Sequence, residues 1–357
     1  MKCIENHEIY LKQLEGYIHN YIDWNVLSGK TIMISGATGM IGHTIIDLIM
    51  RRNALYHSNI HVIALSRSEI TVKERFYSYL SKEEFHFFIS DLEQEVNVGD
   101  LQVDYLIHAA SNTHPIQYAQ DPIGTITANV IGTKNLLDYA VKKSIDRVIF
   151  LSSVEVYGEN RGDAEAFKED YCGYIDCNTL RAGYPESKRT GEALCQAYLH
   201  SKNIDIVIPR LSRVYGPTML ATDSKAIAQF IKRAIEEKDI ILKSSGSQKY
   251  SYTYVIDAAM AILFLLLNGE NGEVYNVAEE HSSITLYDLA KLLAKEAGTK
   301  VVMEIPEETE NKGYSTATKA ILDPSKLQAL GFKPKTSIKE GIKSTITILK
   351  YLNKSVD

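Results

Sequence analysis

Six short segments that are apolar at nearly every position recur through the first 210 residues of this 357-residue chain. Longer stretches with helical spacing separate most of them, such as Gly42–Met50 and Ile123–Lys143. Strands that are apolar on both faces are typical of a parallel sheet with helices on both sides. The pattern therefore predicts an α/β fold built on a doubly wound parallel sheet. The strand candidates are Thr31–Ser35, His61–Leu65, Phe85–Ser90, Tyr105–Ala110, Arg147–Ser153 and Asp205–Arg210.

A glycine-rich turn, "GATGMIG" (Gly36–Gly42), follows the first predicted strand. In a dinucleotide-binding unit the first glycine allows the tight turn and the second lets the backbone approach the pyrophosphate. The third lets the helix pack on the strand. The helix that begins here offers unpaired N–H groups and the positive end of its dipole to the phosphates. Because a strand precedes this turn and an apolar-periodic helix follows it, we predict a Rossmann-type dinucleotide site.

The second strand ends at Ser66 and Arg67, where the choice between NAD and NADP is usually made. A carboxylate here would bind the ribose 2′-hydroxyl of NAD, whereas an arginine accommodates the 2′-phosphate of NADP. Ser66 and Arg67 favour NADP, with an Arg67 that only stacks on adenine or faces solvent as the alternative. Asp91, after the third strand, is a candidate for an adenine contact or a helix cap. The predicted cofactor is NAD or NADP.

The strand–helix rhythm loosens after residue 210, which indicates a second, smaller lobe. A helix at Lys225–Glu237, short strands near Ile240–Leu242 and Tyr252–Val255, and a helix at Tyr287–Ala297 are expected there. We predict an N-terminal helical extension at 1–29, a dinucleotide-binding Rossmann domain at 30–210 and a mainly substrate-binding lobe at 211–357. The second lobe is expected to interleave with the first.

The charge and the cysteines exclude several classes of function. A net charge of −6 argues against a nucleic-acid surface, which would need a basic patch. The four cysteines form no C-x-x-C pair, which suits free thiols in a reducing compartment and no metal site. The longest apolar run, Ala258–Leu267, is too short to span a bilayer and is expected to form a buried helix capped by Asp257. We predict a cytoplasmic protein without a membrane partner.

Several further segments occur in an order that resembles a known family. They are "HAAS" (His108–Ser111), "NVIGTKNLL" (Asn129–Leu137), "LSSVEVYG" (Leu151–Gly158), "YPESK" (Tyr184–Lys188), "RVYGP" (Arg213–Pro217) and "YVIDA" (Tyr254–Ala258). From Lys30 to about Leu352 the chain resembles the extended short-chain dehydrogenase/reductases, the NAD-dependent epimerase/dehydratase family of nucleotide-sugar enzymes. The segments "DPIGTITANVIGT" and "EDYCGYIDCNTLRAGYPESKR" look most like UDP-glucuronate decarboxylases.

The resemblance gives Tyr184, Lys188 and Ser153 catalytic roles. A tyrosine and a lysine four residues apart lie on one face of a helix. A free tyrosine has a pKa of about 10, so only about one in a thousand is ionised at pH 7. The Lys188 ammonium and the nicotinamide charge are expected to lower this pKa, so that Tyr184 can take the proton of a sugar hydroxyl. Ser153 is expected to hydrogen-bond the same substrate oxygen.

The resemblance also implies a larger set of cofactor contacts. His108, although close to the cofactor, is interpreted as structural. The predicted cofactor-binding residues are Gly36, Thr38, Gly39, Met40, Ile41, Gly42, Ser66, Arg67, Asp91, Leu92, Ala109, Ala110, Ser111, Asn129, Tyr184 and Lys188.

Two departures from related enzymes concern the substrate. Dehydratases carry an Asp–Glu pair after the hydroxyl residue, whereas this chain has Val154 before Glu155. Glu155 is a candidate second acid/base, or a substrate contact. Many relatives place a phosphate-binding arginine where this chain has Tyr250, and a tyrosine cannot replace its charge-assisted contacts. Lys249 and Arg213 are therefore candidate substrate contacts, as are Ser153, Glu155 and Tyr250.

The resemblance implies a nucleotide-diphosphate-sugar enzyme that oxidises sugar C4 and returns the hydride. Val154 disfavours dehydration and Tyr250 disfavours decarboxylation, so 4-epimerisation is the preferred prediction. Decarboxylation of a UDP-glucuronate-type substrate, a one-way 4-keto-sugar reductase and a non-catalytic dinucleotide sensor remain as alternatives. Relatives pair through two helices per subunit, so we expect a homodimer through Ile123–Lys143 and the helix at Pro185.

Overall fold

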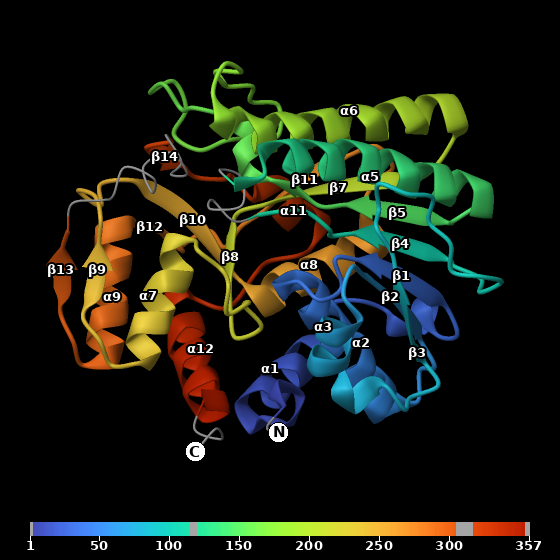
Figure 1. Cartoon of the computed structure of the whole chain (residues 1–357), viewed down its shortest axis with the longest axis horizontal. Coiled ribbons are helices and arrows are strands. Elements are labelled where there is room, and N and C mark those ends of the chain that lie inside the picture. The colour runs from blue at the N-terminus through green and yellow to red at the C-terminus, as the bar shows by residue number, and fades with distance from the viewer. Residues whose placement is uncertain (1–2, 114–119, 305–316, 354–357) are drawn as a thin grey trace.

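A parallel sheet forms the centre of the first lobe. The computed structural model describes residues 3–113, 120–304 and 317–353. The strand order is β11-β7-β5-β4-β1-β2-β3, with β6 beside β7 (Figure 1). Every pairing in it is parallel, which confirms the doubly wound, Rossmann-like prediction. Its strands are β1 (Thr31–Ser35), β2 (His61–Ser66), β3 (Phe85–Ile89), β4 (Tyr105–His108), β5 (Arg147–Phe150), β6 (Ser152–Ser153), β7 (Ile206–Leu211) and β11 (Val274–Val277).

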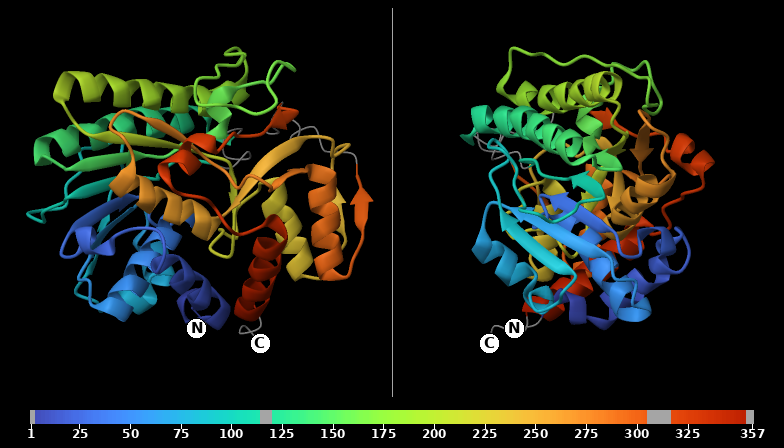
Figure 2. Two further views of the ribbon diagram at one scale, coloured as in Figure 1. Left: turned by 180° about the vertical axis from the view of Figure 1, so that it is seen from behind. Right: turned by 90° about the vertical axis from the view of Figure 1, so that its right-hand side faces the viewer.

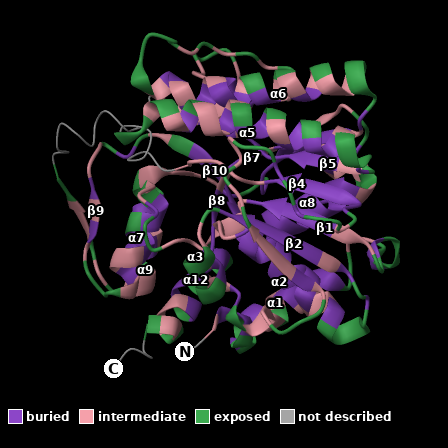
Figure 3. Cartoon of the chain, turned by 45° about the vertical axis from the view of Figure 1, so that its right-hand side comes forward, coloured by how far each residue is buried: buried purple, intermediate pink, exposed green. Residues whose placement is uncertain are grey.

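Helices cover both faces of this sheet, as the apolar strands require. On one side α5 (Pro122–Lys143) packs against α6 (Gly183–Lys202). On the other lie α1 (Glu8–Ile18), α2 (Met40–Tyr56), α3 (Glu69–Arg75) and α8 (Val255–Asn268) (Figures 1 and 2). Successive residues of β1 enter different cores, since Ile32 and Ile34 belong to one buried cluster and Met33 to the other. The sheet is accordingly buried almost throughout (Figure 3).

The second lobe is smaller and interleaves with the first. It contains a sheet in the order β12-β10-β14, with β8 beside β10, and a separate β13-β9 pair. After β10 the chain returns to the first lobe through α8 and β11, and it enters the second lobe again at β12. The elements of the second lobe are β8 (Arg213–Tyr215), α7 (Ala226–Ile235), β9 (Ile240–Leu242), β10 (Lys249–Tyr254), β12 (Ser283–Thr285), α9 (Leu286–Ala297), β13 (Val301–Met303), β14 (Lys319–Ala320), α11 (Ser325–Leu330) and α12 (Ile338–Asn353).

The start of α8 differs from the prediction. Its N-cap is Tyr254, and Asp257 lies inside the first turn. The Asp257 carboxylate instead accepts backbone N–H groups of Lys335 and Thr336 and the Tyr17 hydroxyl, at 2.8, 3.0 and 2.5 Å. A buried carboxylate thus joins three separate chain segments rather than capping its own helix. No helix among the described residues has the length and apolarity to cross a membrane.

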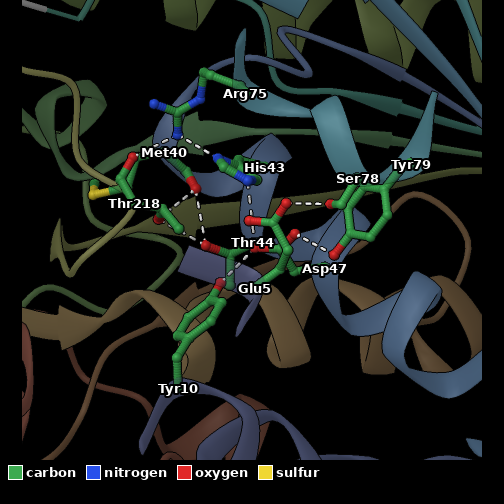
Figure 4. A network of polar contacts seen from close by, with 10 residues as sticks. All are labelled: Glu5, Tyr10, Met40, His43, Thr44, Asp47, Arg75, Ser78, Tyr79 and Thr218. Carbon is green, nitrogen blue, oxygen red and sulfur yellow. Dashed lines mark hydrogen bonds and ion pairs between the residues drawn. The ribbon is translucent and has the colours of Figure 1, made fainter. Parts of the chain in front are cut away.

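The N-terminal extension is part of the folded core. Its α1 buries Tyr10, Leu14, Tyr17 and Ile18. The Tyr10 hydroxyl donates to Asp47 of α2 at 2.8 Å, and the Tyr79 hydroxyl donates to the same carboxylate at 2.9 Å. Figure 4 shows this network, which also includes Glu5, Met40, His43, Thr44, Arg75, Ser78 and Thr218. The extension therefore packs directly against the helix that follows the glycine-rich turn.

Candidate active site

A cavity of about 1100 Å³ is lined by residues of both lobes. The glycine-rich turn lines it, together with residues of α7, β9 and β10. Lys225, Arg233 and Lys243, which sequence reasoning missed, also line it. Of the residues predicted from the sequence, its wall contains Gly36, Gly39, Met40, Ile41, Gly42, Ala109, Ser111, Ser153, Glu155, Tyr184, Lys188, Arg213 and Tyr250.

The glycine-rich turn has no room for side chains. Gly36 has a φ of +67°, and a Cβ there would lie 2.6 Å from the backbone of Ala110. A Cβ on Gly42 would lie 2.5 Å from the carbonyl oxygen of Gly36. Gly39 is the N-cap of α2, so the first N–H groups of that helix follow it directly. These features fit a dinucleotide whose pyrophosphate approaches the backbone at the positive end of α2.

The residues predicted to bind the adenosine part of the cofactor lie at or just after the carboxyl ends of β2 and β3. The Ser66 hydroxyl lies 3.4 Å from that of Thr38 and accepts the Ser68 backbone N–H at 3.2 Å. Arg67 is exposed. Asp91 is also exposed and accepts the Glu93 N–H at 3.1 Å, so its carboxylate supports its own turn. Thr38, Ser66, Arg67 and Asp91 do not line the cavity, and their cofactor contacts stay predictions.

Three other predicted cofactor residues, Asn129, Leu92 and Ala110, do not line the cavity. Asn129 is buried, accepts the Ser111 hydroxyl at 2.7 Å and donates to the Ser187 hydroxyl at 2.8 Å. It therefore orients Ser111, which does line the cavity. Leu92 is held by the Asn135 amide, which donates to its carbonyl at 2.8 Å. Ala110 closes over Gly36.

His108 is structural, as interpreted from the sequence. Its two ring nitrogens lie 2.8 Å from the Ser35 hydroxyl and 3.0 Å from the Thr133 hydroxyl. Burial, and then the Lys188 charge, lower its pKa to about 3. The imidazole is therefore neutral near pH 7 and links β1, β4 and α5.

The structure brings Tyr184, Lys188 and Ser153 together in the wall of the cavity. Tyr184 and Lys188 are one turn apart on α6 and are both buried. The Tyr184 phenol is hydrogen-bonded to the hydroxyls of Ser153 and Ser111. The Lys188 ammonium donates to the Leu151 carbonyl at 2.8 Å. Ser111 was predicted only as a cofactor contact, and its hydrogen bond to the Tyr184 phenol was not predicted.

The pKa of Tyr184 differs from the prediction. Burial raises it to about 12, although hydrogen bonding with Ser153 and Ser111 acts to lower it. The pKa of Lys188 is itself lowered to about 8 by burial. In the protein alone, the cost of placing a phenolate in this buried site therefore outweighs the stabilisation by its neighbours. The expected lowering requires further positive charge beside the phenol.

Glu155 lies between two arginines. The Arg181 guanidinium donates to one carboxylate oxygen at 2.8 Å, and that of Arg213 lies 3.7 Å from the other. The Arg213 guanidinium also lies 3.8 Å from the centre of the Tyr250 ring. Glu155 is thus a member of an ordered ion-paired cluster rather than an independent loop carboxylate.

Lys249 is not brought into the cavity. It is exposed, at the first position of β10, whereas Tyr250 and Tyr252 further along this strand line the wall. The prediction that Lys249 replaces a phosphate-binding arginine therefore has no support from its position. Lys225, Arg233 and Lys243 are separated by eight and ten residues, and their convergence depends on how α7 packs against β9. No sequence signal that we used would have selected them.

Comparisons with known proteins agree with this geometry. The model of the NAD dependent epimerase/dehydratase family matches residues 32–278. UDP-glucuronic acid decarboxylase 2 of Arabidopsis thaliana is 27% identical over 314 residues, which cover 88% of this chain and 67% of the relative.

Two crystal structures share the fold. That of UDP-glucuronic acid 4-epimerase from Bacillus cereus, with UDP-glucuronic acid and NAD, has a TM-score of 0.76 at 24% identity and covers 90% of this chain and 99% of the other. That of UDP-glucose 4-epimerase from Thermotoga maritima, with UDP-glucose, has a TM-score of 0.74 at 23% identity and covers 92% and 100%. The chain belongs to the NAD dependent epimerase/dehydratase family and is an enzyme of the nucleotide-sugar epimerase/dehydratase type.

Proposed function

We propose that the protein epimerises a nucleotide-diphosphate sugar at C4, through a 4-keto intermediate. The observation that carries this proposal is the meeting of Ser153, Tyr184 and Lys188 in the wall of a cavity that the glycine-rich turn also lines. NAD, on which the family depends, would be held at the glycine-rich turn and would supply a hydride acceptor and a positive charge beside the phenol. Hydride given back to the opposite face of the C4 carbonyl would invert C4 and leave the net reaction redox-neutral.

The chain's own residues move the proton and hold the sugar. Tyr184, as the phenolate, takes the proton of the C4 hydroxyl while the C4–H bond is broken. Ser153 and Ser111, which already hydrogen-bond the phenol, keep that oxygen oriented toward the substrate. Lys188 lies one helical turn after Tyr184 and donates a hydrogen bond to the Leu151 carbonyl. Its ammonium stabilises the phenolate electrostatically. On return of the hydride, Tyr184 gives the proton back.

The residues beside Ser153 support epimerisation over elimination of water. Val154 has no group that can move a proton, so the carboxylate pair that dehydration requires is incomplete. Glu155 is engaged by Arg181 and Arg213, which favours a role in substrate binding over independent acid–base chemistry. Decarboxylation of a UDP-hexuronic acid is the second candidate, because the curated relatives at 26–27% identity are named UDP-glucuronic acid decarboxylases.

Product analysis with a panel of nucleotide sugars tests the proposal. The purified protein is incubated with NAD and with UDP-glucose, UDP-galactose, UDP-glucuronic acid or UDP-xylose, while absorbance at 340 nm is followed and products are identified by NMR. Conversion to the 4-epimer without a net absorbance change supports epimerisation. A pentose product supports the second candidate, and net oxidation of NADH or NADPH with a 4-keto sugar indicates a reductase. No turnover of any substrate would favour a sensor.

We also propose that α5 and α6 pair with those of a second copy. Ile123, Ile126 and Ile131 of α5 are exposed, at 75, 42 and 40%. Large exposed apolar residues gathered on one helix favour an interface.

The four cysteines are free thiols, which supports the cytoplasm as a reducing location.

A further inference from the structure

We propose that Arg213 binds the diphosphate of the sugar nucleotide, with its guanidinium held in place by Tyr250 and Glu155. The inference rests on the proposed function, since it assigns the anionic part of that substrate. It also explains why Tyr250, which carries no charge, forms part of the cavity wall.

The sheet of the second lobe fixes the Arg213–Tyr250 contact. β8 and β10 pair in parallel, with Arg213 opposite Tyr252. Tyr250, two residues earlier on β10, is on the same face and is a diagonal neighbour of Arg213. Its ring lies against the guanidinium, at 3.8 Å from ring centre to Cζ. An arginine at position 250 would reach the same part of the cavity from the neighbouring strand.

Glu155 constrains the guanidinium from a second side. Its carboxylate lies 3.7 Å from Nη2 of Arg213, and the side chain of Arg213 is only 22% exposed. An aromatic face and a carboxylate together restrict the rotamers of this long side chain before a ligand binds. Less conformational entropy is then lost on binding, which favours a preorganised anion contact.

The position along the cavity selects the diphosphate over the rest of the ligand. Glu155 follows Ser153 by two residues, so Arg213 lies beside the catalytic residues, on a strand that pairs with β10. In a pyranose, C4 and C1 are on opposite sides of the ring. With the C4 hydroxyl at Tyr184, C1 and the phosphate attached to it point away from α6, toward β8 and β10.

The local charge agrees with an anionic partner. The cluster has two guanidinium groups, Arg181 and Arg213, around one carboxylate, Glu155, so its net charge is positive. The planar fork of a guanidinium also matches a phosphate with two parallel hydrogen bonds. Arg181 forms the shorter ion pair with Glu155, which leaves Arg213 as the better placed of the two for the substrate.

Nucleotide binding to four forms of the full chain tests the assignment. Dissociation constants for UDP, dTDP, CDP, GDP and ADP are measured by calorimetry with NAD present, and the tightest of them is used throughout. For Arg213→Gln we expect a roughly 10- to 100-fold weaker affinity, from the loss of one charge-assisted contact. The double variant Arg213→Gln/Tyr250→Arg should recover most of it, because the second arginine enters the same space. Arg181→Gln, which removes the same charge nearby, should change the affinity less than about threefold.

Every result bears on the inference. Unchanged diphosphate binding by Arg213→Gln overturns it, including the case in which only UDP-glucuronic acid binds more weakly, because Arg213 would then contact the sugar acid. Equal losses in the two arginine variants, no recovery in the double variant, or a wild-type protein that binds none of the five nucleotides also reject it. Unchanged NAD affinity shows that each variant is folded. Turnover assays of the wild type separate the two proposals: a wild type that binds the nucleotide but converts no nucleotide sugar contradicts the proposed function alone.

Discussion

At the scale of single residues, Lys188 combines a functional position with a cost in stability. It is buried, and burial lowers its pKa to about 8 from the ordinary value of 10.5. The folded protein therefore releases this proton at lower pH than the unfolded chain does. By linkage, Lys188 makes the folded state more stable as pH rises from about 8 to 10.5, and below that window its desolvation cost is fully present.

Replacement of Lys188 by Met should expose both properties. We expect kcat to fall by at least about 100-fold, since the phenolate loses its cationic neighbour. The melting temperature of the variant, relative to the wild type, should be highest near pH 7 and should decrease toward pH 10, because only the wild type gains from deprotonation. Parallel melting curves over this range would show that Lys188 titrates normally.

Gly42 and Gly16 offer a matched pair of alanine substitutions. A Cβ at Gly42 would lie 2.5 Å from the Gly36 oxygen and 2.9 Å from the Cα of Ala37, and backbone cannot move aside easily. We expect Gly42→Ala to cost roughly 1–3 kcal/mol of unfolding free energy and to weaken NAD binding. Gly16, inside α1, has nothing within 4 Å, so its alanine variant should gain about 0.5–1 kcal/mol. Urea titrations and NAD binding measure both; equal effects would contradict the packing explanation.

The residue scale also shows what the sequence could and could not reveal. Tyr184, Lys188 and Ser153 were predictable because the order of several motifs resembles a known family, and helical spacing then puts Tyr184 and Lys188 on one face of α6. The prediction that Lys249 contacts the substrate is not supported by its position outside the cavity. Which face of a strand a residue occupies depends on how the strand pairs with its neighbours. The raised pKa of Tyr184 was missed because its desolvation depends on how α6 is buried against β6.

At the scale of elements, the N-terminal extension is tied to α2 by a buried carboxylate. Burial, and then the charge of Glu5, raise the pKa of Asp47 to about 7, although the hydroxyls of Tyr10 and Tyr79 act to lower it. His43 lies 3.5 Å away, but burial and Arg75 lower its pKa well below 6.5, so it is neutral near pH 7. The folded protein thus binds a proton at Asp47 that the unfolded chain has lost above pH 4.

This difference predicts how Asp47→Asn alters the pH dependence of stability. Between about pH 4 and 7 the contribution of Asp47 decreases as pH rises, because the folded state holds the extra proton. Asparagine does not titrate, so the wild type should lose stability relative to the variant across this window. Urea unfolding at pH 5 and pH 7.5 measures the difference. If the two proteins change in parallel, Asp47 titrates normally in the fold.

Helices and strands were easier to predict than the contacts between them. The six predicted segments account for seven of the eight strands of the first sheet, since Arg147–Ser153 covers both β5 and β6, and continuous apolar runs need cover on both faces. The eighth strand, β11, and the crossing of α8 back to the first lobe depend on contacts between residues far apart in sequence. Asp257 was expected to cap α8 for the same reason: its partners Tyr17, Lys335 and Thr336 are distant along the chain.

At the scale of the whole molecule, the extension joins the two lobes. Tyr10 bonds to α2 in the first lobe, and Gln13 donates to Ser344 of α12 in the second at 3.0 Å. Trp24 and Leu27, beyond α1, are also in the main hydrophobic cluster. Yet the family match begins at residue 32, so the extension lies outside the part of the fold that the family model covers.

Removal of residues 1–29 should therefore destabilise both lobes together. The deletion uncovers apolar surface on α2, α8 and α12 and leaves Asp47 and Asp257 without their tyrosine partners. At about 25 cal/mol per Å² of apolar surface, losing several buried aromatic and aliphatic side chains outweighs a typical stability of about 5–15 kcal/mol. We expect the shortened chain to bind a dye specific for exposed apolar surface and to lose its cooperative melting transition. A shortened chain that melts cooperatively within a few degrees of the full protein would show that the family core is stable alone and that the extension only covers it.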